Sequence, residues 1–397
     1  MPSLVVQYPG GFGNRGGSGS RCGQGVGPCG NGECCSSSNV CGTSAASCEV
    51  GCQPRFGLCT PGPTGRVPPP FDNRSNSPFR QHATPCTRPR IRKEFRTLTA
   101  LERAAFVNGI HCLRKIPSGF PQDFGSKSAY DDFVYVHMIS GGLAHNTASF
   151  FPWHRLYLQN FEDLLRVMCG YTAPLPYWDW TIDAAAPQNS PVWDASFMGG
   201  DGDPITSCIG TGPFRNMQGV HPAPHCVKRR FDLSHNMYSQ FYTATEVNRI
   251  VTTSTSYHTF RDQIETRPHS SVHFSVGGDL AQAPISVNDP IFFLHHANMD
   301  RLWALWQGQS PNNLYAYGGN RNQESAYQYA TLYDKLQMMG LSGDMQVKDL
   351  MNTVGGGRFC YQYQNEVYPR QLRFAKRDGT SANFTLEELA KVNPDQF

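Results

Sequence analysis

The sequence is poor in charged residues and has no long apolar run. Charged residues make up 16% of the 397 residues, and the lysines and arginines are scattered, so no basic patch indicates a nucleic-acid partner. A membrane-spanning helix needs a run of about 18 apolar residues. The chain contains none, so we expect no membrane partner. A hydrophobic content of 39% is still sufficient for a folded core.

Cysteines are unevenly distributed along the chain. Of the 14 cysteines, eight lie between Cys22 and Cys59, and six are spread thinly over the rest, at positions 86, 112, 169, 208, 226 and 360. Even numbers in both groups are typical of disulfides made in an oxidising compartment. In the second group Cys208 and Cys226 are closest in sequence, and we predict that they form a disulfide.

Secretion agrees with two N-x-S/T sequons, at Asn73 and Asn383. The first residues have neither the basic nor the apolar part of a signal peptide. We therefore expect that a signal peptide has been removed and replaced by an initiator methionine, and that the protein is extracellular.

Composition divides the chain into five segments. A Gly-rich leader (1–21) precedes a cysteine module (22–59) that is too small for an apolar core and must be held by disulfides. A Pro-rich linker (60–80) leads to a globular domain (81–363) and a tail (364–397). In the tail, "TLEELAKV" is predicted to form a short helix capped by Thr385.

Three stretches of the globular domain carry the apolar period of helices. "SAYDDFVYVHMI" is predicted to end before the glycines at 141–142, and "WHRLYLQNFEDLLRVM" has no such break. "NDPIFFLHHANMDRLWALWQ" is predicted to start with Asp289 as N-cap and Pro290 at the first helical position. "HSSVH" is a shorter helical candidate. We expect a mainly helical fold.

Six of the 13 histidines stand out by their placement. His269 and His273 form an i, i+4 pair, a spacing that can chelate a metal. His296 shares a helical stripe with Phe292, whereas His295 projects about 100° away. The six candidates form two triplets: His137, His145 and His154, and His269, His273 and His296. The other histidines, at 82, 111, 221, 225, 235 and 258, are expected to be structural or to lie in loops.

Imidazoles without carboxylates narrow the choice of metal. Calcium and magnesium require oxygen ligands. Paired zinc sites in hydrolases usually include a bridging Asp or Glu, and neither triplet contains one. Copper suits imidazole, and a redox pair with three histidines on each ion could hold dioxygen between them. The spacing favours copper and leaves zinc as the alternative.

Two long stretches resemble a known family. "FFPWHRLYLQNFEDLLR" and "NDPIFFLHHANMDRLWALW", with "RPHSSVH" before the second, resemble the two copper signatures of the tyrosinase and catechol oxidase family, the type-3 copper polyphenol oxidases. The resemblance covers about residues 86–363, where "YQY" is similar to the tyrosine motif that ends the family's catalytic domain. It implies a four-helix bundle enclosing two copper ions. The first copper would take His137, His145 and His154, and the second His269, His273 and His296.

The resemblance also implies supporting residues around the copper ligands. His295 would lie just outside the ligand set. Asp300 and Glu162 are candidates for ordering the ring N–H groups, or for ordinary helix ion pairs with Arg301 and Arg166.

His154 lies in an unusually aromatic stretch. We expect Phe150, Phe151 and Trp153 to surround it with a dry shell that keeps the imidazole neutral.

The resemblance implies that catechols are oxidised to o-quinones while O2 is reduced to water, so phenols and O2 are the expected partners. Hydroxylation of monophenols additionally needs a base, and related tyrosinases hold a water for this with a Glu and an Asn. Glu265 fits the Glu, but Ser270 stands at the Asn position and Phe274 follows His273. We expect o-diphenol oxidation with slow o-hydroxylation of monophenols. A full tyrosinase with strong monophenolase activity is the alternative.

Oxygen carriage and sugar binding are the two other functions that the sequence allows. Molluscan haemocyanins use the same paired sites to carry oxygen, but they cover them with a β-sandwich and carry a Cys–His thioether bridge. Only 34 residues follow Tyr363, and Leu143 stands where the bridging Cys would be, so we expect an open site without the bridge. A purely sugar-binding protein is the third hypothesis, which the copper signatures oppose.

The cysteine module resembles the hevein-like chitin-binding module. That resemblance implies the disulfides 22–35, 29–41, 34–48 and 52–59. Ser36 matches the family's sugar-binding serine, but Ser38, Val40 and Ser47 stand where its aromatic residues would be, and Phe56 is the single aromatic residue of the module. Stacking on a sugar needs flat apolar faces. We expect either weak chitin binding through 22–59 or none.

Overall fold

The computed structural model describes residues 20–22, 29, 34–36, 38–42, 86–323, 329–355, 358–364, 372–375 and 381–384. The chain divides into two compact units, Met1–Pro69 and Pro70–Phe397. The predicted linker at 60–80 and the predicted helix that begins after Thr385 lie outside the described residues.

In the first unit, β1 (Cys34–Cys35) pairs with β2 (Cys41–Gly42) in an antiparallel ladder. Disulfides join Cys22 to Cys35 and Cys29 to Cys41, which are two of the four pairs implied by the hevein resemblance. The pairs 34–48 and 52–59 involve residues outside the described ones.

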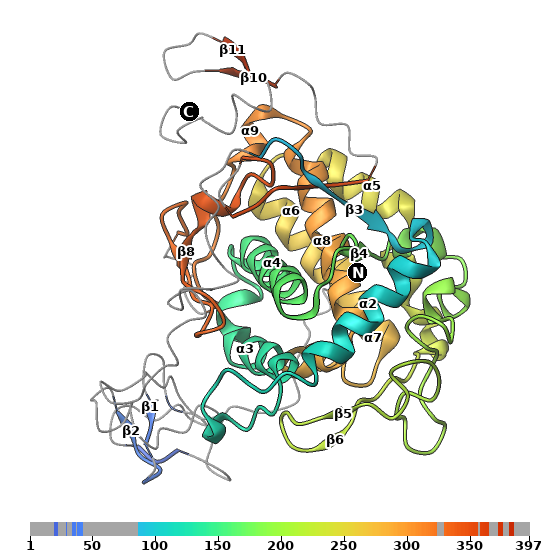
Figure 1. Ribbon diagram of the computed structural model, residues 1–397. Coiled ribbons are helices and arrows are strands. Elements are labelled where there is room, and N and C mark those ends of the chain that lie inside the picture. Colours follow the sequence, from blue (N-terminus) through green and yellow to red (C-terminus); the bar gives the residue numbers. More distant parts are fainter. Residues whose placement is uncertain are drawn as a thin grey trace. The chain divides into compact units, whose positions relative to one another are not determined.

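The second unit is mainly helical, as predicted (Figure 1). The helices in its described residues are α2 (Ala100–Leu113), α3 (Ala129–Ala144), α4 (Phe150–Cys169), α5 (Ala244–Thr253), α6 (Tyr257–Ile264), α7 (Ser270–Val276), α8 (Ile291–Gln307) and α9 (Pro311–Leu314). A π-helical segment, η8 (Glu265–His269), links α6 to α7. The 3-10 segments of this unit include η4 (Trp180–Asp183), η9 (Ala283–Asn288) and η7 (Leu233–Phe241), which is kinked at His235–Tyr238.

Strands in this unit are short. A parallel three-stranded sheet has β3 (Arg90–Glu94) between β4 (Pro176–Tyr177) and β9 (Tyr361–Tyr363). Among the described residues of this unit, antiparallel pairs are also formed by β5 (Gln218–Gly219) with β6 (His225–Cys226), β7 (Lys335–Leu336) with β8 (Met345–Gln346), and β10 (Leu372–Ala375) with β11 (Ser381–Phe384).

Two helix boundaries differ from the sequence prediction. α3 starts with a capping box between Ser128 and Asp131, but it continues through the two glycines to Ala144. Glycine costs about 1 kcal/mol in a helix interior, which packing can outweigh. α8 starts at Ile291 with Pro290 as its cap, although Asp289 still accepts a hydrogen bond from the Ile291 N–H at 3.1 Å.

The segment η8 contains a proline. Pro268 has no N–H and its ring would clash with the preceding turn of an α-helix, and here the chain widens into a π-helical turn from Glu265 to His269. Such turns often mark functional sites. His269, one of the predicted metal ligands, is the last residue of this turn.

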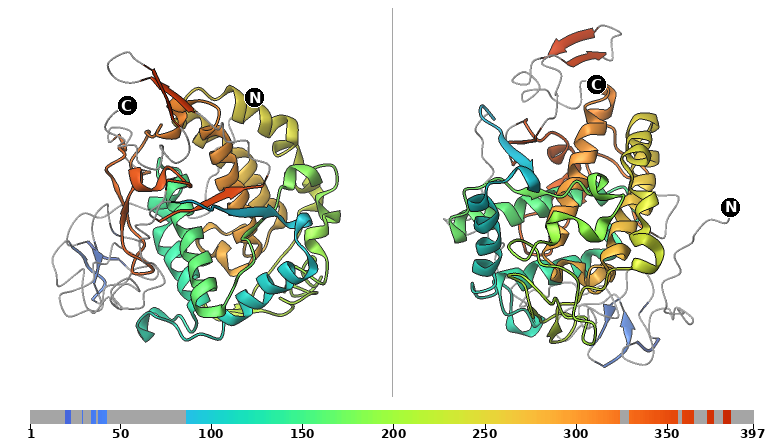
Figure 2. Two further views of the ribbon diagram at one scale, coloured as in Figure 1. Left: turned by 45° about the horizontal axis from the view of Figure 1, so that its top comes forward. Right: turned by 90° about the vertical axis from the view of Figure 1, so that its right-hand side faces the viewer.

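The core lies around α4, which packs against α2, α3 and α8 (Figure 1, Figure 2). The rings of Phe161 and Phe293 stack with centroids 3.5 Å apart, and Phe133 meets Phe161 edge-on at 5.5 Å. The residues of α4 from Phe150 to Glu162 are all buried. This packing fixes α3, α4 and α8 relative to one another.

Three disulfides secure the second unit. Cys208 pairs with Cys226, as predicted. The remaining pairs, Cys86 with Cys360 and Cys112 with Cys169, could not be assigned from the sequence. No helix in the described part of the chain is long and apolar enough to cross a membrane.

Candidate metal centre

Two groups of histidines are buried in the helical unit. Within each group, ring nitrogens lie within 4.8 Å of one another. The first group is His137, His145 and His154, and the second is His269, His273, His295 and His296. The structure thus brings together all six histidines predicted as ligands and adds His295 to the second group.

Helices α3 and α4 build the first group. His137 lies within α3, His145 ends this helix, and His154 lies one turn into α4. The ring centroids of His137 and His145, and of His145 and His154, are 5.0 Å apart. Three imidazoles that surround one point can serve one metal ion.

The second group is built by η8, α7 and α8. His269 ends η8 and His273 follows one turn later, so their ring centroids are 4.5 Å apart. His296 approaches from α8, and its Nε2 lies 3.3 Å from Nε2 of His273. Two ring nitrogens at this distance can share one proton or bind the same metal ion.

The two groups are adjacent. The rings of His154 and His296 stack with centroids 4.4 Å apart, and those of His145 and His269 are 6.3 Å apart. Two metal ions, one in each group, would therefore be neighbours, as a dinuclear site requires.

Backbone carbonyls orient four of the rings. Nδ1 of His154 lies 2.7 Å from the Phe150 carbonyl oxygen, and Nδ1 of His273 lies 2.7 Å from that of Leu280. Nδ1 of His145 lies 3.2 Å from the Gly141 carbonyl oxygen, and Nδ1 of His269 lies 3.2 Å from that of Glu265. A ring that donates from Nδ1 leaves the Nε2 lone pair free for a metal.

The predicted role of Glu162 and Asp300 in ordering ring N–H groups is wrong. Glu162 binds Arg92 at 2.9 Å and Arg166 at 3.1 Å. Asp300 accepts hydrogen bonds from Arg155, Tyr361 and Tyr363, each at 2.6 Å. The alternative prediction for Glu162, an ion pair with Arg166, is confirmed. The alternative for Asp300 is not, because Asp300 pairs with Arg155 and Arg92 and not with Arg301.

The aromatic shell around His154 is mostly as predicted. Phe150 and Trp153 each lie with their ring centroid 4.9 Å from that of His154. Phe151, the third residue predicted in this shell, instead stacks on Phe260 and Trp303. On the second group, Phe292 stacks on His296 at 4.1 Å.

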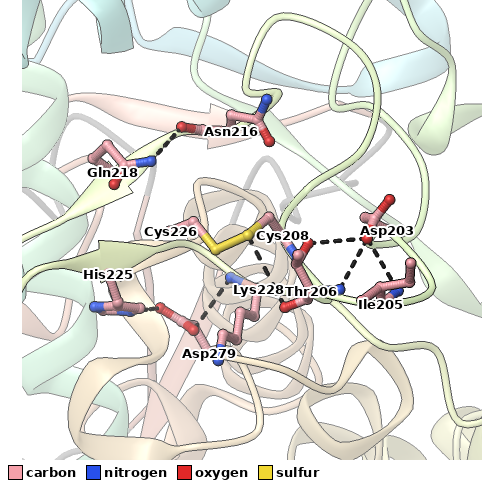
Figure 3. Close-up of a disulfide and its surroundings, with 10 residues drawn as sticks. All are labelled: Asp203, Ile205, Thr206, Cys208, Asn216, Gln218, His225, Cys226, Lys228 and Asp279. Carbon is pink, nitrogen blue, oxygen red and sulfur yellow. Dashed lines mark hydrogen bonds and ion pairs between the residues drawn. A yellow bond between two sulfur atoms is a disulfide. The ribbon is translucent and has the colours of Figure 1, made fainter.

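Asp279, which was not found from the sequence, is held beside the Cys208–Cys226 disulfide (Figure 3). Asp279 is buried and accepts from Nε2 of His225 at 2.7 Å and from the Lys228 N–H at 3.2 Å. It directly precedes Leu280, whose carbonyl orients His273. His225, predicted to lie in a loop, belongs to β6, next to the Cys208–Cys226 disulfide.

Glu265, Ser270 and Phe274, the predicted catalytic residues, lie along η8 and α7. The Glu265 carboxylate accepts from the Asn146 N–H at 2.5 Å and from Arg261 at 2.9 Å. Burial raises its pKa to about 7, although Arg261 opposes this shift. The Ser270 hydroxyl donates back to the Glu265 carbonyl at 2.8 Å, and Phe274 is 40% exposed.

Comparisons with known proteins agree with these groups. Residues 127–309 match the common central domain of tyrosinase. The tyrosinase-like protein phomQ1' of Diaporthe leptostromiformis is 34% identical over 317 residues, which cover 70% of this chain and 81% of the relative. The tyrosinase ustQ of Aspergillus flavus is 36% identical over 295 residues, which cover 70% of this chain and 80% of the relative. The chain belongs to the tyrosinase family.

The solved structure of a polyphenol oxidase variant from Thermothelomyces thermophila is also similar. It is 29% identical, superimposes with a TM-score of 0.62, and the match covers 70% of this chain and 89% of that one. Together these matches make the protein a copper-dependent oxidase with a dinuclear copper cofactor and a tyrosinase-type helical fold.

The histidines of this tyrosinase-family protein fit copper. Among the six histidines predicted as ligands, the buried ring nitrogens without a hydrogen-bond partner in the described residues are Nε2 of His154 and His269, Nδ1 of His296, and both nitrogens of His137. Such orphaned atoms are rare in folded proteins. Burial lowers the pKa of every histidine in the two groups, to about 4 for His145 and His273. Neutral imidazoles with free lone pairs are what copper needs.

Exposure shows where the tyrosinase-type site opens. His145, His269 and His273 retain 7–9% of their exposure, whereas His154 retains 3% and His296 none. Solvent therefore reaches the site beside η8 and α7, where Ser270 and Phe274 also lie.

Proposed function

We propose that the protein oxidises o-diphenols to o-quinones, with only slow o-hydroxylation of monophenols. In the overall reaction two catechols each lose two electrons and two protons, and one O2 is reduced to two waters. The proposed ligands are His137, His145 and His154 for the first copper, and His269, His273 and His296 for the second. When bound, the copper pair supplies the redox chemistry with O2.

The protein's own residues orient and shield this chemistry. Carbonyl oxygens hold four of the imidazoles at Nδ1, which fixes the direction of each Nε2. Phe150, Trp153 and Phe292 pack against the rings and exclude water from the deep side. Catechol enters from the opening beside Phe274 and reaches the site with its hydroxyl groups first.

The arrangement of Glu265 and Ser270 carries the preference for diphenols. Hydroxylation of a monophenol needs a base that removes the phenolic proton. The Glu265 carboxylate is already engaged by Arg261 and by the Asn146 N–H, and the Ser270 hydroxyl is turned to a backbone carbonyl. This pair therefore holds a base water poorly. The oxidation of a catechol depends less on this water, because a catechol does not need to be hydroxylated.

Oxygen uptake by the copper-loaded protein tests this proposal. We expect fast uptake with catechol, a slow reaction with a lag for tyrosine, and a new near-ultraviolet absorption band after addition of hydrogen peroxide. Turnover of tyrosine as fast as that of catechol would identify a full tyrosinase. A band without uptake on either substrate would mean an oxygen carrier or a blocked entrance.

We also propose that the protein is secreted. The disulfides among the described residues, including Cys86–Cys360 and Cys112–Cys169, support an oxidising compartment. Recovery of the protein from culture medium, with a mass that falls after glycosidase treatment, tests secretion and the sequons together.

For the cysteine module we propose at most weak sugar binding. The Ser36 and Ser38 hydroxyls lie 2.9 Å apart, and Ser38 and Val40 offer no flat face to a sugar ring. Retention of the full chain on chitin, compared with retention on cellulose, tests this. Strong chitin-specific retention would contradict it.

A further inference from the structure

A row of three rings extends from the opening of the site onto the surface. Phe274, which directly follows His273, lies with its ring centroid 6.3 Å from that of Tyr238. The ring of Tyr238 stacks on His235 at 5.1 Å with an interplanar angle of 11°. The Phe274 ring is 40% exposed and the His235 side chain 61% exposed. We call these three residues the aromatic shelf.

The backbone under the shelf is strained. Asn236, Met237 and Tyr238 have φ values of 49°, 50° and 52°. Non-glycine residues rarely adopt this left-handed conformation, and a run of three is costly unless the surroundings enforce it. Such strain tends to occur at ligand sites.

Hydrogen bonds enforce this conformation from both ends. The Asp232 carbonyl accepts from the Met237 N–H at 2.8 Å, and the Asp232 carboxylate holds Nδ1 of His235 at 2.9 Å. The hydroxyl of Tyr242 donates to the Met237 carbonyl at 2.8 Å. The shelf is therefore built by defined contacts.

The shelf segment is also fixed to the helix that carries His273. The Asp232 N–H donates to the Ser275 carbonyl at 2.9 Å, and the Arg230 N–H to that of Val276 at 3.0 Å. A Cβ added to Gly277 would lie 2.1 Å from the Arg230 carbonyl oxygen, so only glycine permits this approach. Tyr238 thus holds a set distance from Phe274 and from the opening.

We propose that the aromatic shelf is a substrate subsite that binds a second planar ring of a phenolic substrate. A phenol whose reacting ring lies at the copper pair and whose second ring extends past Phe274 would stack on Tyr238. The enzyme would accordingly prefer two-ring phenols over single-ring phenols. This inference rests on the proposed phenol oxidase function, which it extends to a substrate class.

Turnover of 4-phenylcatechol and of catechol by the copper-loaded full chain is the first measurement. An aromatic pair contributes enough to change a binding constant about two- to tenfold. In Tyr238→Asn, which removes the ring but tolerates the left-handed backbone, the ratio of kcat/KM for 4-phenylcatechol to that for catechol should fall about two- to tenfold. Tyr238→His keeps a planar ring and should retain most of the ratio. Leu101→Ala, at an exposed position on α2, should leave it unchanged.

Equilibrium dialysis separates this inference from the proposed function. Benzoate and biphenyl-4-carboxylate differ by one ring, and neither can be oxidised to a quinone. The wild type should bind the two-ring acid more tightly, and Tyr238→Asn should lose most of that preference. If neither catechol is turned over but the wild type still prefers the two-ring acid and Tyr238→Asn does not, the oxidase proposal is wrong and the aromatic shelf is still supported as a binding site. An equal preference in Tyr238→Asn and wild type would overturn the shelf, whatever the turnover.

Discussion

Nε1 of Trp180 lies 3.2 Å from Nδ1 of His295. Because an indole N–H can only donate, Nδ1 of His295 must be the acceptor, and the proton of the neutral ring is then on Nε2. His295 shares the second histidine group with His296, but a protonated Nε2 cannot bind a metal. The Trp180 hydrogen bond therefore favours His296 over His295 as the proposed copper ligand.

Trp180→Phe should remove this selection. His295 could then adopt the other tautomer and compete with His296 for copper. In a His145→Ala background, where copper should remain in the second group alone, we expect the electron paramagnetic resonance spectrum of copper(II) to show a mixture of nitrogen environments. Trp178→Phe is the matched control, since its indole donates to Asp183 at 2.8 Å and the same segment is perturbed. Identical spectra for Trp180→Phe and its parent would refute the selection.

His145→Ala should reduce bound copper from two ions per chain to about one. The first group would keep two of its three imidazoles, and a site that loses one of three protein ligands loses most of its affinity. Copper content after dialysis, measured by mass spectrometry, reports this directly. His258→Ala, outside both groups, should keep two ions. Two retained ions in His145→Ala would show that this residue is not a ligand.

Ser270→Asn should raise the ratio of tyrosine to catechol turnover. An amide at this position can help Glu265 to orient a water, which the serine hydroxyl does not do while it binds the Glu265 carbonyl. General-base assistance is worth about 10²–10⁴ in rate, so we expect a partial gain of roughly tenfold in the ratio. Oxygen uptake on both substrates gives the ratio. An unchanged ratio would mean that Ser270 does not limit monophenol hydroxylation.

The sequence predicted the parts of the site that depend on local spacing. The i, i+4 pair of His269 and His273, the helical stripe of His296 and the long apolar face of α4 are all properties of short segments, and the structure has them. The Cys208–Cys226 disulfide was also found from short separation along the chain. Local regularities of this kind are what apolar periodicity reports.

The parts that were missed depend on contacts between distant segments. Asp300 and Glu162 are candidates for ordering histidine rings because they lie one and two turns away on the same helices, with helix ion pairs as the alternative. Arg92, from β3, reaches both carboxylates instead, and no helical spacing can indicate a strand 70 or more residues earlier. The carbonyl of Leu280 and the indole of Trp180 were missed for the same reason, since neither has a sequence signature.

Glu162→Gln should destabilise the protein in a pH-dependent way. Burial alone would raise the pKa of Glu162, but Arg92, Arg90 and Arg166 lower it to about 2. A carboxyl whose pKa is lower in the folded state than in the unfolded state contributes stability above its unfolded value, and that contribution is lost as the pH falls through the folded value. For Glu162 the contribution is therefore present above about pH 4.5 and lost toward pH 2.

At pH 7 the glutamine variant removes one of the two carboxylate partners of the buried Arg92, which keeps its ion pair with Asp300. Removing one partner of a buried ion pair typically costs about 3–5 kcal/mol, and because Asp300 remains we expect the lower end of this range. The difference in unfolding free energy between wild type and variant should shrink as the pH is lowered from about 4.5 toward 2. Urea unfolding of the metal-free protein at several pH values, followed by tryptophan fluorescence, measures this difference. Glu246→Gln removes a surface partner of Arg249 and Arg267 and should cost no more than about 1 kcal/mol. A difference for Glu162→Gln that stays constant with pH would show that its charge does not stabilise the fold.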